Sequence, residues 1–127
     1  MLFPETFNTL NQLKSLGLKL GVISNFDTRI YAVLDVLGIR DFFDAITVSS
    51  EAGYAKPDRR IFEAAVRALG VPASSVLLVG DSLRDDVEPA MGAGMSAILI
   101  DRNNRYTAEA HLRRISSLIE VINEVTS

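Results

Sequence analysis

The 127-residue chain is long enough for one domain with a real core, and 48% hydrophobic and 23% charged residues are typical of a globular protein. A net charge of −3 without a basic tract gives no electrostatic reason to expect nucleic acid or a membrane surface as partner. The chain has no cysteine, no run near the roughly 20 apolar residues of a membrane span, and no signal-peptide pattern. We therefore expect one cytoplasmic domain over residues 1–127.

Helices and strands are predicted to alternate from the first residues onward. Apolar side chains at every third position predict a helix over 4–16, closed by Gly17. The segments that follow are expected to be a strand over 18–24, a helix over about 28–37 that stops at Gly38, a short strand over 45–50, and a helix that Asp58 caps and Gly70 ends. The first half of the chain thus reads as alternating α and β elements.

The second half continues the same alternation. Its expected elements are a strand over 75–80, a helix over about 83–93, a strand over 96–100, and an amphipathic helix over 108–125 that docks on the sheet. Strands separated by helices pair in parallel through right-handed crossovers, so the fold class is α/β, a Rossmann-like parallel sheet of about four strands flanked by helices. Ligands of such sheets bind at the carboxyl ends of the strands.

Polar residues follow the first two predicted strands. Ser24 and Asn25 offer hydroxyl and amide donors for an anion, although the same residue types also serve as plain caps and turns. Lys56 precedes Pro57, which favours an extended or turn conformation for the lysine. Its ammonium could then balance the charge of a phosphate, and the alternative is a solvated loop lysine.

Three carboxylates follow the third strand. Asp85 and Asp86 fall in the first turn of the next helix, where the helix dipole alone favours negative charge. The dipole does not explain Asp81 at the strand tip, and oxygen ligands suit Mg²⁺, which takes one or two carboxylates, waters and a phosphate oxygen. Donors, a lysine and a cation platform together indicate a phosphoryl site, where charge neutralisation and positioning are the main requirements.

The segments VISNFD, SSEAGYAKPDRRIF and VGDSLRDDVEPAMGAGM, in this order, resemble the haloacid dehalogenase (HAD) superfamily, most of whose members are Mg²⁺-dependent phosphatases. Within it, they are most similar to the HAD-like hydrolase domain-containing protein 3 group. The resemblance implies that Ser24 donates to phosphoryl oxygens with Asn25 as its neighbour. It also implies that Lys56 steadies the charge of the nucleophile and the phosphate.

The same resemblance assigns roles to the acidic residues. Asp81 matches the metal-ligand aspartate, Asp86 matches the second acid of the motif, and Asp85 stands where the family often has asparagine. The implied cofactor is Mg²⁺, and the implied reaction is hydrolysis of a small phosphorylated substrate through an aspartyl-phosphate.

The chain departs from the family at its first motif, because no two of its aspartates lie two positions apart and Asp-x-Asp-x-Thr is therefore absent. Since the first expected helix begins near Pro4, we expect only the C-terminal part of a HAD core, without the first central strand, the nucleophile and the cap that selects substrates. The flanking strands would then lie about 9.6 Å apart. We expect the isolated chain either to pair these strands directly or to self-associate through their unpaired edges.

Three functional hypotheses follow from these observations. The first is a HAD phosphatase core that is inactive alone for lack of the nucleophile. The second is a non-catalytic module with the same fold that binds Mg²⁺ or a partner. The third, a receiver-like signalling domain, disagrees with the motif order, because a receiver carries its acid pair first and its lysine last, whereas here the hydroxyl of Ser24 precedes Lys56 and the acids come third.

Overall fold

The structure is a computed structural model that describes residues 4–101 and 114–126. The helices are α1 (Pro4–Ser15), α2 (Arg29–Leu37), α3 (Ser49–Ala52), α4 (Arg59–Leu69), α5 (Glu88–Gly92) and α6 (Val121–Thr126). The strands are β1 (Gly21–Ser24), β2 (Ala45–Val48), β3 (Leu77–Gly80), β4 (Ser96–Ile100) and β5 (Arg114–Ile115). Short 3₁₀ turns lie at Arg40–Phe42, Ala73–Ser75 and Leu118–Glu120, and a π-helical turn lies at Leu83–Val87. The alternation confirms the predicted α/β class. In the described residues, no helix is long and apolar enough to cross a membrane.

The predicted helix ends of α2 and α4 are confirmed. Gly38 and Gly70 adopt φ angles of +74° and +71°, and their backbone N–H groups donate to the last carbonyls of the two helices. At the start of α4, the Asp58 carboxylate accepts the backbone N–H of Arg60 at 2.9 Å. The hydrogen-bonded side chain of Arg60 holds the pKa of Asp58 at about 2, well below its ordinary value. Local sequence signals therefore set these boundaries.

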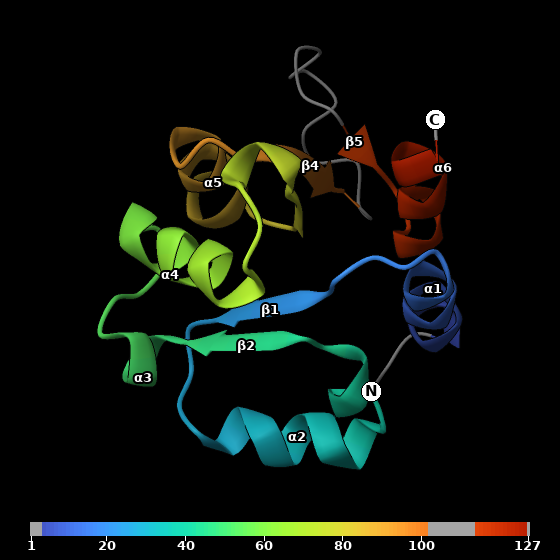
Figure 1. Cartoon of the computed structure of the whole chain (residues 1–127), viewed down its shortest axis with the longest axis horizontal. Coiled ribbons are helices and arrows are strands. Elements are labelled where there is room, and N and C mark those ends of the chain that lie inside the picture. The colour runs from blue at the N-terminus through green and yellow to red at the C-terminus, as the bar shows by residue number, and fades with distance from the viewer. Residues whose placement is uncertain (1–3, 102–113, 127) are drawn as a thin grey trace.

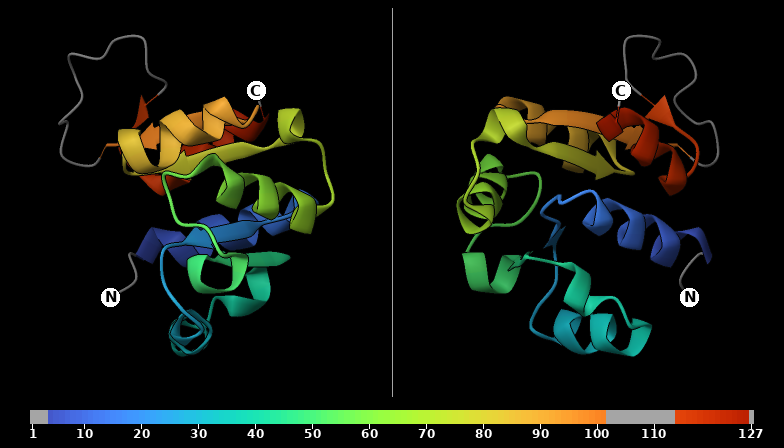
Figure 2. Two further views of the ribbon diagram at one scale, coloured as in Figure 1. Left: turned by 90° about the vertical axis from the view of Figure 1, so that its left-hand side faces the viewer. Right: turned by 45° about the vertical axis from the view of Figure 1, so that its right-hand side comes forward.

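The strands form two separate sheets rather than one, as Figures 1 and 2 show. One sheet pairs β1 with β2 in parallel, Gly21 opposite Ala45, and the other has the order β3-β4-β5, also parallel. Among the described residues, β1 and β3 pair with no strand on their facing sides. The expectation that these two strands pair directly is therefore wrong for this chain, and self-association stays a prediction.

Two helices hold the sheets together in place of strand hydrogen bonds. In α1, Leu10 packs in the cluster of the two-stranded sheet, while Leu13, one turn later, packs in a cluster with Ile98 of β4. In α4, the fully buried Ile61 and Phe62 join a cluster that includes residues of β4 and α5, with Ile23 of β1 and Leu78 of β3 packed against it. Each of the two helices therefore contacts both sheets, although β1 and β3 share no strand hydrogen bonds.

The last predicted helix is only partly correct. Residues 108–113 lie outside the described residues, but Arg114 and Ile115 form β5 beside Leu99 and Ile100 instead of a helix. The Asp101 N–H donates to the Ile115 carbonyl at 2.7 Å, and a Ser117–Glu120 capping box starts a new helical segment at Leu118. The helical spacing of the apolar residues predicted a helix here, whereas the free edge of β4 supplies the partner for a strand.

Candidate functional site

The candidate residues follow the carboxyl ends of the strands, as the fold class predicts. Ser24 is the last residue of β1, opposite Val48 of β2, and Asn25 comes next. Gly80 ends β3, and the exposed Asp81 follows it. Lys56 lies in the loop between α3 and α4. The site is therefore assembled from both sheets.

The central contact of the site is an ion pair between Lys56 and Asp86. The Lys56 Nζ donates to Asp86 Oδ1 at 2.7 Å, and the two side chains are 19% and 9% exposed. A charge-assisted hydrogen bond of this length with little water around it is strong, and removing one partner leaves a nearly buried charge. The interpretation of Lys56 as a solvated loop lysine is wrong, because its ammonium points inward onto an acid.

The position of Asp86 depends on three features around it. The Ser82 N–H donates to its second oxygen at 3.3 Å, and the Ser82 Oγ accepts the Asp85 N–H at 3.0 Å, which caps the turn that carries both acids. A Cβ placed on Gly80 would lie 2.4 Å from the Asp86 Cβ. Glycine at the end of β3 is therefore what allows Asp86 to pack against the strand tip.

The side chain of Asn25 contacts the Lys56 backbone. Its Oδ1 accepts the Lys56 N–H at 2.7 Å, and its Nδ2 donates to the Lys56 carbonyl at 3.0 Å. The sequence predicted that Asn25 lies beside the phosphate as the neighbour of Ser24. The prediction used only the polar character of the residue after the strand, which does not indicate a contact with the Lys56 backbone. Two bonds to one residue instead connect the end of β1 to the loop that carries the lysine.

The three acids differ in exposure. Asp81 is exposed, Asp85 is half-buried and Asp86 is buried. In the part of the chain that the structure describes, no group of three or more His, Cys, Asp or Glu side chains is arranged to hold a metal. Asp81 and Asp86 nevertheless line one cavity together with Lys56. Carboxylate oxygens are the ligand type that Mg²⁺ takes, together with waters and ligand oxygens, so the chemistry of these two residues fits this ion.

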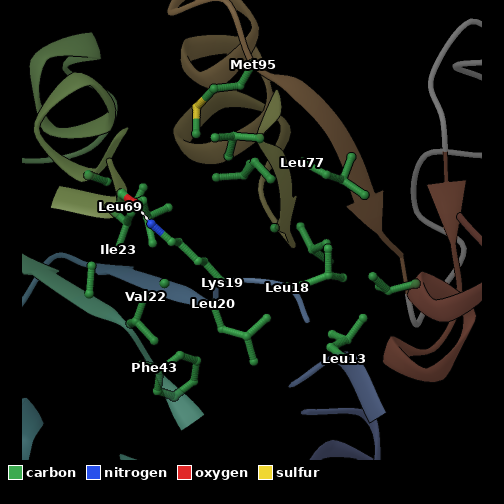
Figure 3. Close-up of a pocket in the computed structure, with 18 of the residues that line it drawn as sticks. Leu13, Leu18, Lys19, Leu20, Val22, Ile23, Phe43, Leu69, Leu77 and Met95 are labelled. Atoms are coloured by element: carbon green, nitrogen blue, oxygen red, sulfur yellow. Dashed lines mark hydrogen bonds between the residues drawn. The ribbon is translucent and has the colours of Figure 1, made fainter. Parts of the chain in front are cut away.

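This cavity, of about 960 Å³, lies between the facing edges of β1 and β3. Most of its wall is apolar, and in Figure 3 the side chains of Leu18, Leu20 and Leu77 surround the open space. All four residues of β3 are only half-buried. Among the described residues, no strand pairs with β3 on the side that faces β1, which leaves this edge open to the cavity.

Asp101, the remaining acid at a strand tip, lies in a different environment. Its side chain is 3% exposed and accepts from Arg114 Nη1 of β5 at 3.1 Å. The partner of Asp101 was not foreseen because the sequence pattern placed Arg114 in a helix. The pair fastens β5 to the end of β4, which is a structural role for a residue at the same edge as the candidate site.

Comparisons with known proteins agree on one family. The family model of haloacid dehalogenase-like hydrolases matches residues 1–94. A glyceraldehyde 3-phosphate phosphatase of Methanothermobacter thermautotrophicus is 39% identical over 125 residues, which cover 98% of this chain and 55% of the relative. The haloacid dehalogenase-like hydrolase domain-containing protein 3 of Danio rerio is 40% identical over 102 residues, 80% of this chain and 42% of the relative.

A solved structure gives the same result for the fold. The HAD phosphatase from Thermococcus onnurineus superposes with a TM-score of 0.91 at 30% identity, covering 98% of this chain and 58% of that one. The chain thus spans about half the length of the relatives it matches.

Proposed function

Because the chain belongs to the haloacid dehalogenase-like hydrolases, we propose that it carries the phosphate-binding and Mg²⁺-binding half of a phosphatase site. The observation that carries the proposal is the Lys56–Asp86 ion pair at the carboxyl ends of the strands, facing the same cavity as Asp81. A lysine and two carboxylates at one strand edge supply the charge balance that a phosphoryl group needs.

Each residue has a role in this proposal. Ser24 and Lys56 bind the phosphoryl oxygens, through a hydroxyl and an ammonium. Asp81 and Asp86 hold Mg²⁺, with Asp85 beside them on the same turn. When bound, the ion supplies positive charge against the phosphate. Because Lys56 already contacts Asp86, the lysine also limits the repulsion between Asp86 and Asp81.

We further propose that this chain alone does not hydrolyse phosphate esters. The family reaction passes through an aspartyl-phosphate, and the sequence contains no Asp-x-Asp to supply the nucleophile and its acid-base partner. Without a nucleophile, charge neutralisation binds phosphate but forms no covalent intermediate. The isolated chain should therefore bind inorganic phosphate in the presence of Mg²⁺ and leave phosphate monoesters intact.

The test compares the chain with two lysine variants on p-nitrophenyl phosphate and on inorganic phosphate. Lys56→Ala should weaken phosphate binding about tenfold, as the loss of a charge-assisted contact predicts. Lys14→Ala is the matched control, because Lys14 pairs with Asp44 on the surface away from the site. Mg²⁺-dependent turnover that disappears in Lys56→Ala would show that the chain is active alone. Phosphate binding that is equal in both variants would refute the assigned site.

A second candidate function is a non-catalytic interaction module, which the open cavity between β1 and β3 favours. Within the described ranges, the facing edges of β1 and β3 have no strand partner, and such edges are a template for another chain, here a second copy. Leu18, 37% exposed, lines the cavity, and Val36, 86% exposed, lies on α2 outside it. In sedimentation velocity, Leu18→Lys should reduce self-association and Val36→Lys should leave it unchanged. A monomer at all concentrations would exclude self-association.

A further inference from the structure

We propose that Asn25 acts on Lys56 and not on the phosphate: its amide positions the lysine so that the ammonium reaches Asp86 on the other sheet. The proposal deepens the proposed function and rests on it for the part that concerns phosphate. Its structural part, the placement of Lys56, depends only on contacts within this chain.

The two hydrogen bonds of Asn25 fix both sides of Lys56. The Lys56 N–H and C=O flank the Cα that carries the side chain, and both bond to one amide, at 2.7 Å and 3.0 Å. A single bond would let the loop rotate about its axis, whereas two bonds to one planar group fix its orientation. The direction in which the lysine side chain leaves the backbone is thereby set by Asn25.

The turn that carries Asn25 is itself hydrogen-bonded to the start of α3, the helix that precedes the Lys56 loop. The next residue, Phe26, accepts from Ser49 Oγ at 2.9 Å and from the Ser50 N–H at 3.3 Å through its carbonyl. The turn after β1 is thus tied to the start of α3 as well as to Lys56. Asn25 therefore stands on a fixed turn and can hold the lysine in place.

The lysine in turn connects the two sheets at their carboxyl ends. Asn25 follows β1, and Asp86 lies on the turn after β3, and these strands are not paired. The bonds from Asn25 to Lys56 and from Lys56 to Asp86 form a polar chain across this edge. A long, flexible lysine side chain loses rotamer freedom when it bridges such a gap, and an anchored backbone reduces the freedom that remains to be lost.

The first test reads the position of Lys56 without any ligand. Competitive acetylation with acetic anhydride, quantified by mass spectrometry, measures how well the Asp86 contact shields the ammonium of Lys56. Asn25→Ala should raise the rate at Lys56 about fivefold, the effect of about one hydrogen bond. The matched control is Asn11→Ala, an exposed asparagine of α1, which should leave the rate unchanged. An unchanged rate in Asn25→Ala overturns the proposal.

Two internal checks keep this result interpretable. The rate at Lys14, paired with Asp44, should stay constant in every variant, because it reports the intact fold. Asn25→Asp retains an oxygen for the Lys56 N–H and lacks the donor for its carbonyl. The acetylation rate at Lys56 in this variant should therefore lie between those of the unmodified chain and Asn25→Ala. A rate equal to that of the unmodified chain would contradict the proposal that both hydrogen bonds of Asn25 position Lys56.

The second test separates action through Lys56 from direct contact with phosphate. Calorimetric titration with inorganic phosphate and Mg²⁺ should show about fivefold weaker binding in Asn25→Ala, and no further loss when the same change is made in Lys56→Ala. An equal loss in both backgrounds would show that Asn25 contacts phosphate itself and overturn the proposal. If the unmodified chain binds no phosphate, the proposed function fails, and the acetylation rates alone decide the role of Asn25.

Discussion

Gly80, at the end of β3, is the position where a single methyl group should disturb the site most directly. In Gly80→Ala the new Cβ would lie 2.4 Å from the Cβ, 2.7 Å from the Cγ and 2.8 Å from Oδ2 of Asp86. Asp86 cannot move away easily, because its N–H bonds to the Ser82 carbonyl at 3.0 Å and its carboxylate bonds to Lys56. The strand tip and the turn after it must therefore separate.

The size of the effect follows from two opposing contributions. Overpacking of this kind costs about 1–3 kcal/mol, because the closest contact is about 1 Å shorter than an ordinary one. Replacing glycine by alanine also removes freedom from the unfolded chain, which favours folding by about 0.4–1 kcal/mol. We expect Gly80→Ala to lower the free energy of unfolding by about 1–2 kcal/mol and to weaken phosphate binding as Asp86 leaves Lys56.

Gly21→Ala in β1 is the matched control. Its Cβ would meet Leu69 Cδ2 at 3.4 Å, an ordinary contact, so the variant should be as stable as the unmodified chain or slightly more so. Urea unfolding followed by circular dichroism gives the midpoints and slopes for both variants. A Gly80→Ala midpoint equal to that of Gly21→Ala would refute the reasoning. In an Asp86→Gly background, which removes the obstructing Cβ, Gly80→Ala should cost nothing.

Two further predictions concern charged groups. Lys56→Met keeps the apolar stem but leaves the Asp86 carboxylate without its cation, so the free energy of unfolding should fall by about 2–3 kcal/mol. Lys14→Met, at the more exposed pair with Asp44, should cost much less, and equal losses in urea unfolding would contradict this prediction. Asp58 has its pKa lowered to about 2 by Arg60, so its contribution to stability is complete above its ordinary pKa of about 3.9 and is lost as the pH falls toward 2. The stability difference between the unmodified chain and Asp58→Asn should shrink over that range, and a difference independent of pH would contradict the assignment.

The sequence was sufficient for most of the local structure. Glycines at helix ends and aspartate at the start of α4 are signals that act within a few residues, and the structure places caps at Gly38, Gly70 and Asp58 as predicted. The acids and the lysine were found because polar residues after apolar strands are unusual. These inferences required no knowledge of which strands become neighbours.

Two of the predictions that were wrong depended on strand neighbours. Direct pairing of β1 with β3 was one of two outcomes expected from the absence of the central strand, but the two edges stay unpaired in the structure while α1 and α4 each pack against both sheets. Arg114 and Ile115 were placed in a helix by their spacing, and the free edge of β4 makes them a strand. Periodicity describes which side chains share a face, and it does not say which backbone supplies the hydrogen bonds.

The role of Asn25 shows why a polar residue at a strand end is hard to interpret from sequence. The residue was predicted to belong to the site from its position after β1, and that position brings it to the loop that carries Lys56. Its bonding partner is a backbone 31 positions away in the chain, and backbone groups leave no trace in a sequence pattern. Because Lys56 then reaches Asp86, the two sheets share one polar link at the edge where phosphate is proposed to bind. A change at this link should therefore alter stability and ligand binding together, whereas a change at Ser24, for which no such link is seen in the described residues, should alter binding alone.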